Sequence, residues 1–330
     1  MNASSTALTL RVAEARSLNP LIKLLRLCAD GGGVLPGFTA GARVRVQVAL
    51  PGGVQDWRDY SLINWQGAPG ATQAPTSYLM AVRKEVDGRG GSLYMHAQVH
   101  EGQLLTIEPP QNDFTLHTGA GNTVLLAGGI GVTPMVSMAA QRRAEGLPVR
   151  LHYAGRSRES MAFLPELQAL LGDALQVHAD DEKGGPLAIA AVLDACLPTD
   201  HLYVCGPQAM LDAVLGQCQE RGWAQERVHF ELFAAPQVKA GDQPFTVELA
   251  QSGQSWKVAA GQSLLDCLVE NGCDPMFDCK RGECGVCTTT VLEGEIDHRD
   301  YYLSAAEKAK GDVMQICVSR AKGARLVLDL

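Results

Sequence analysis

Four cysteines near the C-terminus have a type and spacing suited to metal chemistry. Cys279, Cys284 and Cys287 lie within nine residues, and Cys317 follows downstream. Thiols crowded in this way could form a disulfide, hold a zinc ion, act as a redox pair or hold an iron–sulfur cluster. The N-terminal residues show no basic stretch followed by an apolar run, so we expect no secretory signal and a cytoplasmic location. A reducing cytoplasm disfavours the disulfide.

The spacing itself distinguishes among the remaining chemistries. C-x4-C-x2-C with a fourth, distant cysteine is the ligand spacing of plant-type 2Fe-2S sites. A structural zinc site would more often combine two C-x2-C pairs, and only one is present here. Gly282 and Gly285 would let backbone N–H groups approach sulfur closely. The sequence therefore predicts a 2Fe-2S cluster bound by Cys279, Cys284, Cys287 and Cys317.

A glycine-rich turn in "TVLLAGGIGVTPM" follows an apolar run that is typical of a buried strand. Gly128, Gly129 and Gly131 form the turn, with Thr133 as the expected N-cap of a helix and Pro134 as its first residue. Such a turn offers N–H groups to a phosphate, although it matches G-x-G-x-x-G imperfectly. "YVCGPQAM" supplies a second strand-to-helix turn with Cys205, Gly206, Pro207 and Met210. Ligands favour the carboxyl edge of a parallel sheet, where both turns should lie.

A third turn of this domain follows the strand "VRLHYAG" and reads "RSRES". An acidic residue at such a position would bind a free ribose 2′-hydroxyl, and it is missing. Arg156, Ser157 and Arg158 could instead accept a 2′-phosphate, or the arginines could lie on a solvated loop or on adenine. The residues alone leave NADH and NADPH open.

Two further segments upstream could bind an anion. Arg58 in "WRDYSLIN" has a planar guanidinium that suits phosphate, although an arginine on an edge strand is the plainer interpretation. "DGRGGSLYM" places Gly88, Arg89, Gly90, Gly91 and Ser92 at an expected helix start. A terminal phosphate at that turn would suit FMN better than FAD, which needs further lining.

The elements that position these residues divide the chain into three domains. Short β-branched runs and glycine turns in residues 7 to 110 predict a small antiparallel barrel. Alternating strands and helices from 122 to about 230 predict a parallel α/β domain. The proline-containing segment 234–244 is an expected linker. We therefore predict a barrel in 1–115, a nucleotide-binding α/β domain in 116–233 and a separate domain with the clustered cysteines in 245–330.

Charge and hydropathy exclude some function classes. The chain of 330 residues has 28 basic and 36 acidic side chains, a formal net charge of −8, which disfavours nucleic acid and anionic membranes as partners. Residues 122–140 carry no charge, but their glycines and Pro134 favour a buried strand, turn and helix over a membrane span.

These motifs together resemble a known family. The last 86 residues resemble a plant-type ferredoxin domain, which has a β-grasp fold. The two turns resemble the nucleotide domain of the ferredoxin reductase superfamily. R-x-Y-S at residues 58–61 resembles the flavin motif of that superfamily, which implies that the barrel in 1–115 binds a flavin. The order of the three domains resembles the phthalate dioxygenase reductase family, including vanillate demethylase reductases, along nearly the whole chain.

The resemblance implies roles for individual residues. Ser61 would approach the reactive flavin nitrogen and Cys205 would lie beside the nicotinamide, so these two are the expected catalytic residues. Phe233 would face the flavin ring, although a core phenylalanine is an alternative. The implied FMN contacts are Arg58, Tyr60, Ser61, Ala81, Val82, Arg83, Gly88, Arg89, Gly90, Gly91, Ser92, Thr133 and Phe233, and the implied NAD contacts are Gly128, Gly129, Gly131, Thr133, Pro134, Arg156, Cys205, Gly206, Pro207 and Met210.

The family also implies a direction of electron flow, from NADH through FMN and the 2Fe-2S cluster to a Rieske-type terminal oxygenase. A plant-type cluster lies near about −400 mV and a Rieske centre at roughly −150 to +300 mV, so this transfer is downhill. We expect a monomer that meets its oxygenase transiently. Two alternatives stay open: a reductase serving a ferredoxin, a cytochrome or a non-Rieske oxygenase, and a non-enzymatic iron–sulfur sensor or interaction protein.

Overall fold

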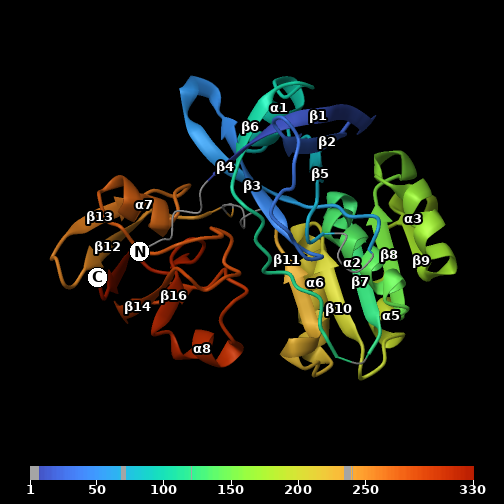
Figure 1. Ribbon diagram of the computed structural model, residues 1–330. Coiled ribbons are helices and arrows are strands. Elements are labelled where there is room, and N and C mark those ends of the chain that lie inside the picture. The colour runs from blue at the N-terminus through green and yellow to red at the C-terminus, as the bar shows by residue number, and fades with distance from the viewer. Residues whose placement is uncertain (1–6, 68–71, 120, 234–238, 240) are drawn as a thin grey trace. The chain divides into compact units, whose positions relative to one another are not determined.

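The computed structural model describes residues 7–67, 72–119, 121–233, 239 and 241–330. The chain divides into two compact units, Met1–Phe233 and Ala234–Leu330 (Figure 1). The first unit holds an antiparallel sheet and a parallel α/β domain, and the second holds a smaller mixed sheet. These are the three domain types that the sequence predicts, so the predicted fold class is confirmed.

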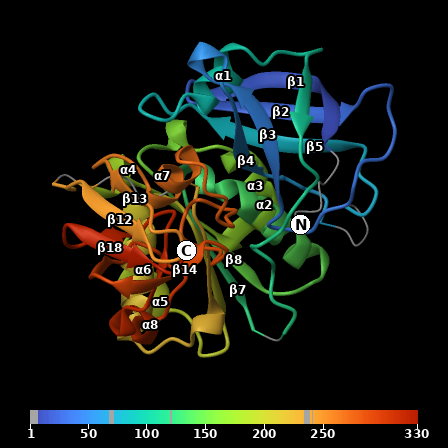
Figure 2. The ribbon, with the colours of Figure 1, turned by 90° about the vertical axis from the view of Figure 1, so that its left-hand side faces the viewer.

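The antiparallel sheet has six strands in the order β4-β3-β6-β1-β2-β5. Just beyond β4, the Ile63 N–H donates to the Leu79 carbonyl of β5 at 2.8 Å, which joins the two edge strands. Helix α1 (Gly91–Ala97) packs against β3, β4 and β5, and Figure 2 shows it at one end of the sheet. The strands are β1 (Leu8–Asn19), β2 (Ile22–Ala29), β3 (Arg43–Ala49), β4 (Gln55–Ser61), β5 (Ser77–Arg83) and β6 (Leu104–Ile107).

The α/β domain has five parallel strands in the order β11-β10-β7-β8-β9. The chain runs from β7 to β8 and β9 in one direction and then returns to β10 and β11 on the other side of β7. Right-handed crossovers in opposite directions place α2 and α3 on one face and α5 and α6 on the other. The strands are β7 (Thr123–Gly128), β8 (Val149–Gly155), β9 (Leu175–Ala179), β10 (His201–Cys205) and β11 (Val228–Glu231), and the helices are α2 (Val132–Ala144), α3 (Leu164–Leu171), α4 (Asp180–Lys183), α5 (Ile189–Asp194) and α6 (Gln208–Glu220).

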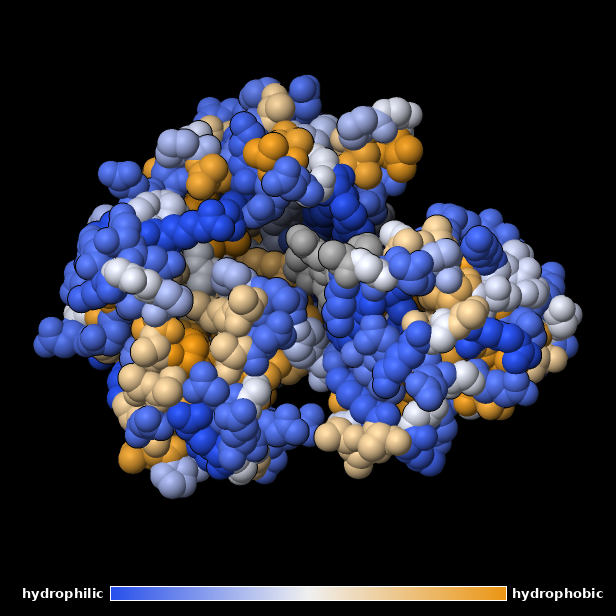
Figure 3. All heavy atoms as spheres, turned by 180° about the vertical axis from the view of Figure 1, so that it is seen from behind, coloured by the Kyte–Doolittle hydropathy of each residue, from blue (hydrophilic) through white to orange (hydrophobic). Residues whose placement is uncertain are grey.

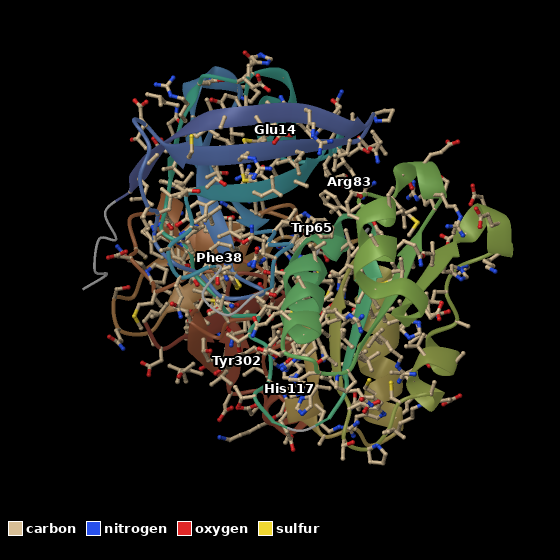
Figure 4. The ribbon with its side chains drawn as sticks, turned by 45° about the vertical axis from the view of Figure 1, so that its right-hand side comes forward. Glu14, Phe38, Trp65, Arg83, His117 and Tyr302 are labelled. Carbon is tan, nitrogen blue, oxygen red and sulfur yellow. The ribbon has the colours of Figure 1, made fainter. Side chains whose placement is uncertain are left out.

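A common apolar core joins the barrel to the α/β domain. Leu79 and Ala81 of β5 belong to the same buried cluster as Met135 and Met138 of α2. The Ser137 hydroxyl of α2 reinforces this contact, since it donates to the Leu62 carbonyl and accepts from the Asn64 N–H, both at 2.8 Å. Trp65, which Figure 4 labels, packs edge-on against Phe163 of the α/β domain, with 5.5 Å between ring centroids. The two domains therefore form one unit, and the predicted boundary at 115/116 falls in the connection between β6 and β7.

The C-terminal unit has a five-stranded sheet in the order β13-β12-β18-β14-β16 and a two-stranded sheet of β15 and β17. Helix α7 buries Leu264, Leu265 and Leu268 against this sheet, and the Ser263 hydroxyl caps its first turn. The elements are β12 (Phe245–Leu249), β13 (Ser255–Val258), α7 (Leu264–Glu270), β14 (Thr288–Glu293), β15 (Ile296–Asp297), α8 (Ala305–Lys310), β16 (Val313–Gln315), β17 (Arg320–Ala321) and β18 (Arg325–Leu328).

The predicted linker 234–244 lies largely outside the described residues, since only 239 and 241–244 are described. Its described end is packed on the C-terminal unit. Both carboxylate oxygens of Asp242 accept hydrogen bonds from Arg299, at 2.5 and 2.8 Å, and both side chains are more than nine-tenths buried. This ion pair holds the pKa of Asp242 at about 2.

The face shown in Figure 3 is mainly hydrophilic, with apolar patches separated from one another. Among the helices formed by the described residues, none combines the length and the apolar character that crossing a membrane requires.

Candidate functional site

The two predicted nucleotide turns lie next to each other. They follow β7 and β10, which pair in parallel at the point where the strand order reverses. An added Cβ at Gly131 would lie 2.2 Å from the Cys205 carbonyl oxygen, and one at Gly128 would lie 2.5 Å from Pro207. Glycine is therefore required for the close approach of the turns. A crevice at the carboxyl ends of adjacent strands, on either side of such a reversal, is where open α/β sheets bind their ligands.

The helix after the first turn begins earlier than the sequence predicts. Gly131 is the N-cap of α2, and Thr133 and Pro134 are its second and third residues. The Thr133 hydroxyl donates to the Ile130 carbonyl at 3.0 Å and caps nothing. The prediction of Thr133 as N-cap is wrong because a 3-10 turn over Gly129–Gly131 leads directly into the helix. The glycine turn still precedes the helix start.

The loop after β8 places the two predicted arginines differently. The Arg158 Nε donates to Glu182 Oε1 at 2.7 Å, whereas no ion pair or side-chain hydrogen bond of Arg156 is found among the described residues. Ser157 caps the short turn Arg158–Ser160. Of the two guanidinium groups, Arg156 is the one without a carboxylate partner.

Arg58 and the turn at the start of α1 lie together, although 33 residues separate Arg58 from Gly91. An added Cβ at Gly91 would meet the Arg58 Nε at 2.6 Å, and Arg58 Nη2 donates to the Arg89 carbonyl at 3.3 Å. Asp56 forms an ion pair with the same guanidinium. Burial alone would raise the pKa of Asp56, but hydrogen bonds from Arg58 and the Trp57 N–H lower it. The two predicted anion-binding groups thus come together at one place.

Ser92, the last residue of the predicted anion-binding turn 88–92, also forms a structural contact. Its hydroxyl accepts from the Glu85 N–H at 3.0 Å and so ties α1 to the segment after β5. Its side chain is thus held by Glu85, and its main chain forms part of the turn.

Tyr60 and Ser61 lie at the end of β4, where Tyr60 is partly buried and Ser61 is buried. Burial raises the pKa of the Tyr60 hydroxyl above its usual range, so this phenol stays neutral. Ser61 is 5% exposed, and its hydroxyl has no hydrogen-bond partner among the described residues. A buried hydroxyl without a partner costs free energy unless a bound group satisfies it. Ser61 therefore fits a site that is completed by a ligand.

The remaining predicted flavin residues lie in three settings. Ala81 and Val82 of β5 turn their side chains into two different buried cores, so only their main chain is available to a ligand. Arg83 Nη1 lies 3.1 Å from Glu85 at the end of the same strand, and Figure 4 labels it. Phe233 is 40% exposed and follows β11 at the end of the unit.

The four C-terminal cysteines form two pairs. The side chains of Cys279 and Cys284 interact with each other, as do those of Cys287 and Cys317. Among the described residues, no three or more His, Cys, Asp or Glu side chains are grouped so as to hold one metal ion. Two pairs of thiols suit two metal atoms with two protein ligands each, which is the requirement of a 2Fe-2S cluster and differs from a tetrahedral zinc site.

Backbone N–H groups surround these sulfurs. The pKa of Cys279 is lowered to about 5, first by the hydrogen bond from Cys284 and then by N–H groups that include that of Arg281, at 3.3 Å from the sulfur. The hydrogen bond to Cys279 and burial raise the pKa of Cys284. Donors aimed at sulfur stabilise thiolates, the form that binds iron.

The loop itself depends on left-handed backbone conformations. Gly282 and Gly285 have φ of 79° and 77°, and the ring of Tyr302 would lie 2.3 Å from a Cβ on Gly285. Lys280 has φ of 53°, which is rare for a residue other than glycine. The glycines let the loop turn tightly around the sulfurs.

Two residues at this site were not predicted. Gln315 is fully buried, its Oε1 accepts from the Cys287 thiol at 3.3 Å, and its Nε2 donates to Thr288 Oγ1 at 2.6 Å. Tyr302 covers the loop from a distant segment. Gln315 has a weak sequence signal, since it is a polar residue in the apolar run that leads to Cys317. Tyr302 has none, because its contact is purely tertiary.

Two family models match the chain. Residues 247–322 match the 2Fe-2S iron-sulfur cluster binding domain, and residues 104–228 match the N-terminal domain of dimethylamine monooxygenase subunit DmmA-like proteins. The vanillate O-demethylase oxidoreductase of a Pseudomonas species is 42% identical over 316 residues, which cover 94% of this chain and 95% of the relative. The heme-dependent oxidative N-demethylase beta subunit of Ectopseudomonas mendocina is 39% identical over 326 residues, which cover 99% of this chain and all of the relative.

Among solved structures, phthalate dioxygenase reductase is similar along the whole chain, with a TM-score of 0.73, 38% identity and 98% coverage of each chain. The chain belongs to the phthalate dioxygenase reductase family. It is an oxidoreductase and the reductase component of an oxygenase system. The predicted family, enzyme class and 2Fe-2S cluster are confirmed, and homology implies a flavin and a nicotinamide coenzyme.

Proposed function

We propose that this reductase oxidises NADH with FMN as its flavin, and that it delivers electrons singly to a Rieske-type terminal oxygenase. The proposal depends on one observation: Arg58 contacts the Gly90–Gly91 turn. The same strand holds the buried Ser61 hydroxyl, which has no hydrogen-bond partner among the described residues. A guanidinium and main-chain amides at one point suit a terminal phosphate. When bound, the flavin would accept hydride and release single electrons, and the cluster would carry one electron at a time.

The residues of the chain bind and orient in this proposal. Arg58 and the main chain of residues 88–92 hold the phosphate, Tyr60 packs on the ring, and Ser61 presents its hydroxyl to the reactive edge. The turns at 128–134 and 205–210 hold the coenzyme across β7 and β10, with Cys205 at the nicotinamide and Arg156 at the ribose. Cys279 and Cys284 bind one iron, and Cys287 and Cys317 the other. In this proposal, residues 1–115 bind the flavin, residues 116–233 bind the coenzyme, and residues 245–330, after the linker 234–244, bind the cluster.

A second acceptor class has specific support. The relative that matches 99% of this chain is the beta subunit of a heme-dependent oxidative N-demethylase, so chains of this organisation are not tied to one kind of acceptor. A heme-containing oxygenase is therefore the second candidate partner. The substrate of the oxygenase is a property of that partner, because the reductase does not bind it.

A spectrum of the purified protein tests the cofactors. We expect flavin absorption together with the broad bands of a 2Fe-2S cluster, and both should bleach under anaerobic NADH. Chromatography of the released flavin should identify FMN; release of FAD would refute that part. No bleaching with either NADH or NADPH would refute the reductase function. Co-purification with the native oxygenase, followed by identification of its iron centre, would decide between the two acceptor classes.

A further inference from the structure

The loop after β8 and the short helix α4 form one charged surface at the carboxyl edge of the α/β sheet. Gly155 of β8 and Ala179 of β9 are register partners, so Arg156 and Asp180 are the next residues of adjacent strands. The Asp181 N–H donates to the Arg156 carbonyl at 3.1 Å and fixes α4 against the loop. In open α/β sheets of this kind, the residues just after this strand contact the adenosine ribose.

Acidic side chains offset the arginines of this surface. Residues 156–159 and 180–183 together carry three positive and four negative side chains, a formal excess of one negative charge. The Glu182 carboxylate lies 2.7 Å from the Arg158 Nε, and the two side chains are 44% and 51% exposed. Asp180 and Asp181 precede it in the same turn of helix. A phosphate dianion at the ribose would lie near the Arg156 guanidinium, which has no carboxylate partner among the described residues, and near a surface with more carboxylates than basic groups.

We propose that Glu182 is a specificity-determining residue, which favours a free 2′-hydroxyl over a 2′-phosphate by holding Arg158 in an ion pair and adding negative charge beside the ribose. This inference rests on the proposed function, because it assumes that a nicotinamide coenzyme binds across the 128–134 and 205–210 turns. Glu182 lies in α4, outside both turns, and would determine which coenzyme is preferred.

The effect on the two coenzymes differs because their charges differ at this point. One carboxylate acting on a dianion about 8 Å away in a water-like medium changes affinity about fivefold. NADH has a neutral hydroxyl there, so its binding should be nearly insensitive to Glu182. Both side chains are about half exposed, so salt should screen the effect.

The test compares coenzymes in one variant. In Glu182→Gln, the second-order rate of flavin reduction by NADPH, measured anaerobically by stopped flow at low ionic strength, should rise about fivefold. The rate with NADH should change less than twofold. Arg158→Gln in the Glu182→Gln background should reduce the gain, because the released guanidinium provides part of it. The gain should also shrink at high salt.

Glu220→Gln is the matched control, since Glu220 is an exposed glutamate at the far end of α6 and its substitution makes the same change in net charge. Provided that NADH reduces the wild-type flavin, either of two results would overturn the inference. One is an unchanged ratio of the NADPH rate to the NADH rate in Glu182→Gln, and the other is an equal rise of the NADPH rate in Glu220→Gln. If neither coenzyme reduces the wild-type flavin, the proposed function itself fails. Melting temperatures of the variants should match the wild type.

Discussion

At the scale of single residues, the site is defined by polar groups that the protein leaves unsatisfied or arranges in pairs. The buried Ser61 hydroxyl has no hydrogen-bond partner in the part of the chain that the structure describes, whereas the Ser137 hydroxyl, also buried, has two. The cysteines are paired in the order expected for two irons. Such details separate side chains that serve a ligand from those that serve the fold.

Ser61→Ala should separate function from stability. Since none of the described residues forms a hydrogen bond with this hydroxyl, its removal should leave the melting temperature of the flavin-free protein unchanged or slightly higher. The rate of flavin reduction by NADH should fall about fivefold to tenfold, because one hydrogen bond contributes about 1 kcal/mol or slightly more. Ser137→Ala is the control and should destabilise the protein by about 1 to 2 kcal/mol with little effect on the rate per folded molecule. A large loss of stability in Ser61→Ala would contradict this assignment.

At the scale of elements, strands and helices bring distant segments to one point. β4 supplies Arg58, α1 supplies the turn, and the approach of the two depends on the missing side chain at Gly91. Similarly, β7 and β10 bring their two turns into contact at Gly131. Each contact is set by sheet order and register, which no local motif contains.

Gly91→Ala tests the contact between β4 and α1. The new methyl group would displace Arg58, so FMN binding should weaken by about tenfold or more, in line with hydrogen bonds to a charged group. Riboflavin, which lacks the phosphate, should bind the variant and the wild type alike in a fluorescence titration. Gly216→Ala in α6, whose added Cβ would have nothing within 4 Å, is the control. An equal loss of affinity for FMN and for riboflavin would show that the phosphate does not bind at Arg58 and the Gly90–Gly91 turn.

A group of histidines at the other end of the α/β domain gives a prediction about pH. His117, labelled in Figure 4, stacks on His201 with 3.8 Å between ring centroids, and His201 Nδ1 lies 3.1 Å from His229 Nε2. Burial, followed by repulsion from His201, lowers the pKa of His117 and of His229 to about 4. Arg142, hydrogen-bonded to the His117 carbonyl, lowers that of His117 further.

Because these pKa values are lower in the folded than in the unfolded protein, the unfolded chain binds protons first as pH falls. The stabilisation is complete above the unfolded value of about 6.5 and is lost between that pH and about 4. The melting temperature should therefore fall over this range. It should fall less steeply in His229→Phe, which removes one titrating group and keeps an aromatic ring where His229 stacks on Tyr203, with 4.3 Å between ring centroids. His100→Gln, at an exposed position, should keep the wild-type slope. Equal slopes in all three proteins would contradict this origin.

At the scale of the whole molecule, one chain carries two compact units with separate chemistry. The N-terminal unit has a shared core that fixes the barrel against the α/β domain. The C-terminal unit has its own core around α7 and the cysteine loop. In the proposed function, electron delivery needs both units, whereas reduction of the flavin by coenzyme needs only the first.

Cys284→Ser should separate these two activities. Without one of its four ligands the 2Fe-2S cluster should not assemble, so cytochrome c reduction that depends on it should be lost. Flavin reduction by NADH should continue at close to the wild-type rate, because its residues lie in the other unit. Cys273→Ser, outside the loop, is the control and should retain both activities. Loss of flavin reduction in a correctly folded Cys284→Ser protein would contradict the proposed order of electron flow.

The sequence by itself determined the cluster, the glycine turns, the domain types and the family, because each depends on short spacings that local backbone geometry imposes. The spacing of Cys279, Cys284 and Cys287 is one example, and the β7 turn with its glycines is another. The start of α2 was misplaced because a 3-10 turn precedes it, and Tyr302 and Gln315 were missed because their contacts are long-range. Only the tertiary structure brought Arg58 to Gly91, left Ser61 without a partner and placed Glu182 against Arg158. Those relations follow from strand order, register and core packing, which join residues that the sequence keeps apart.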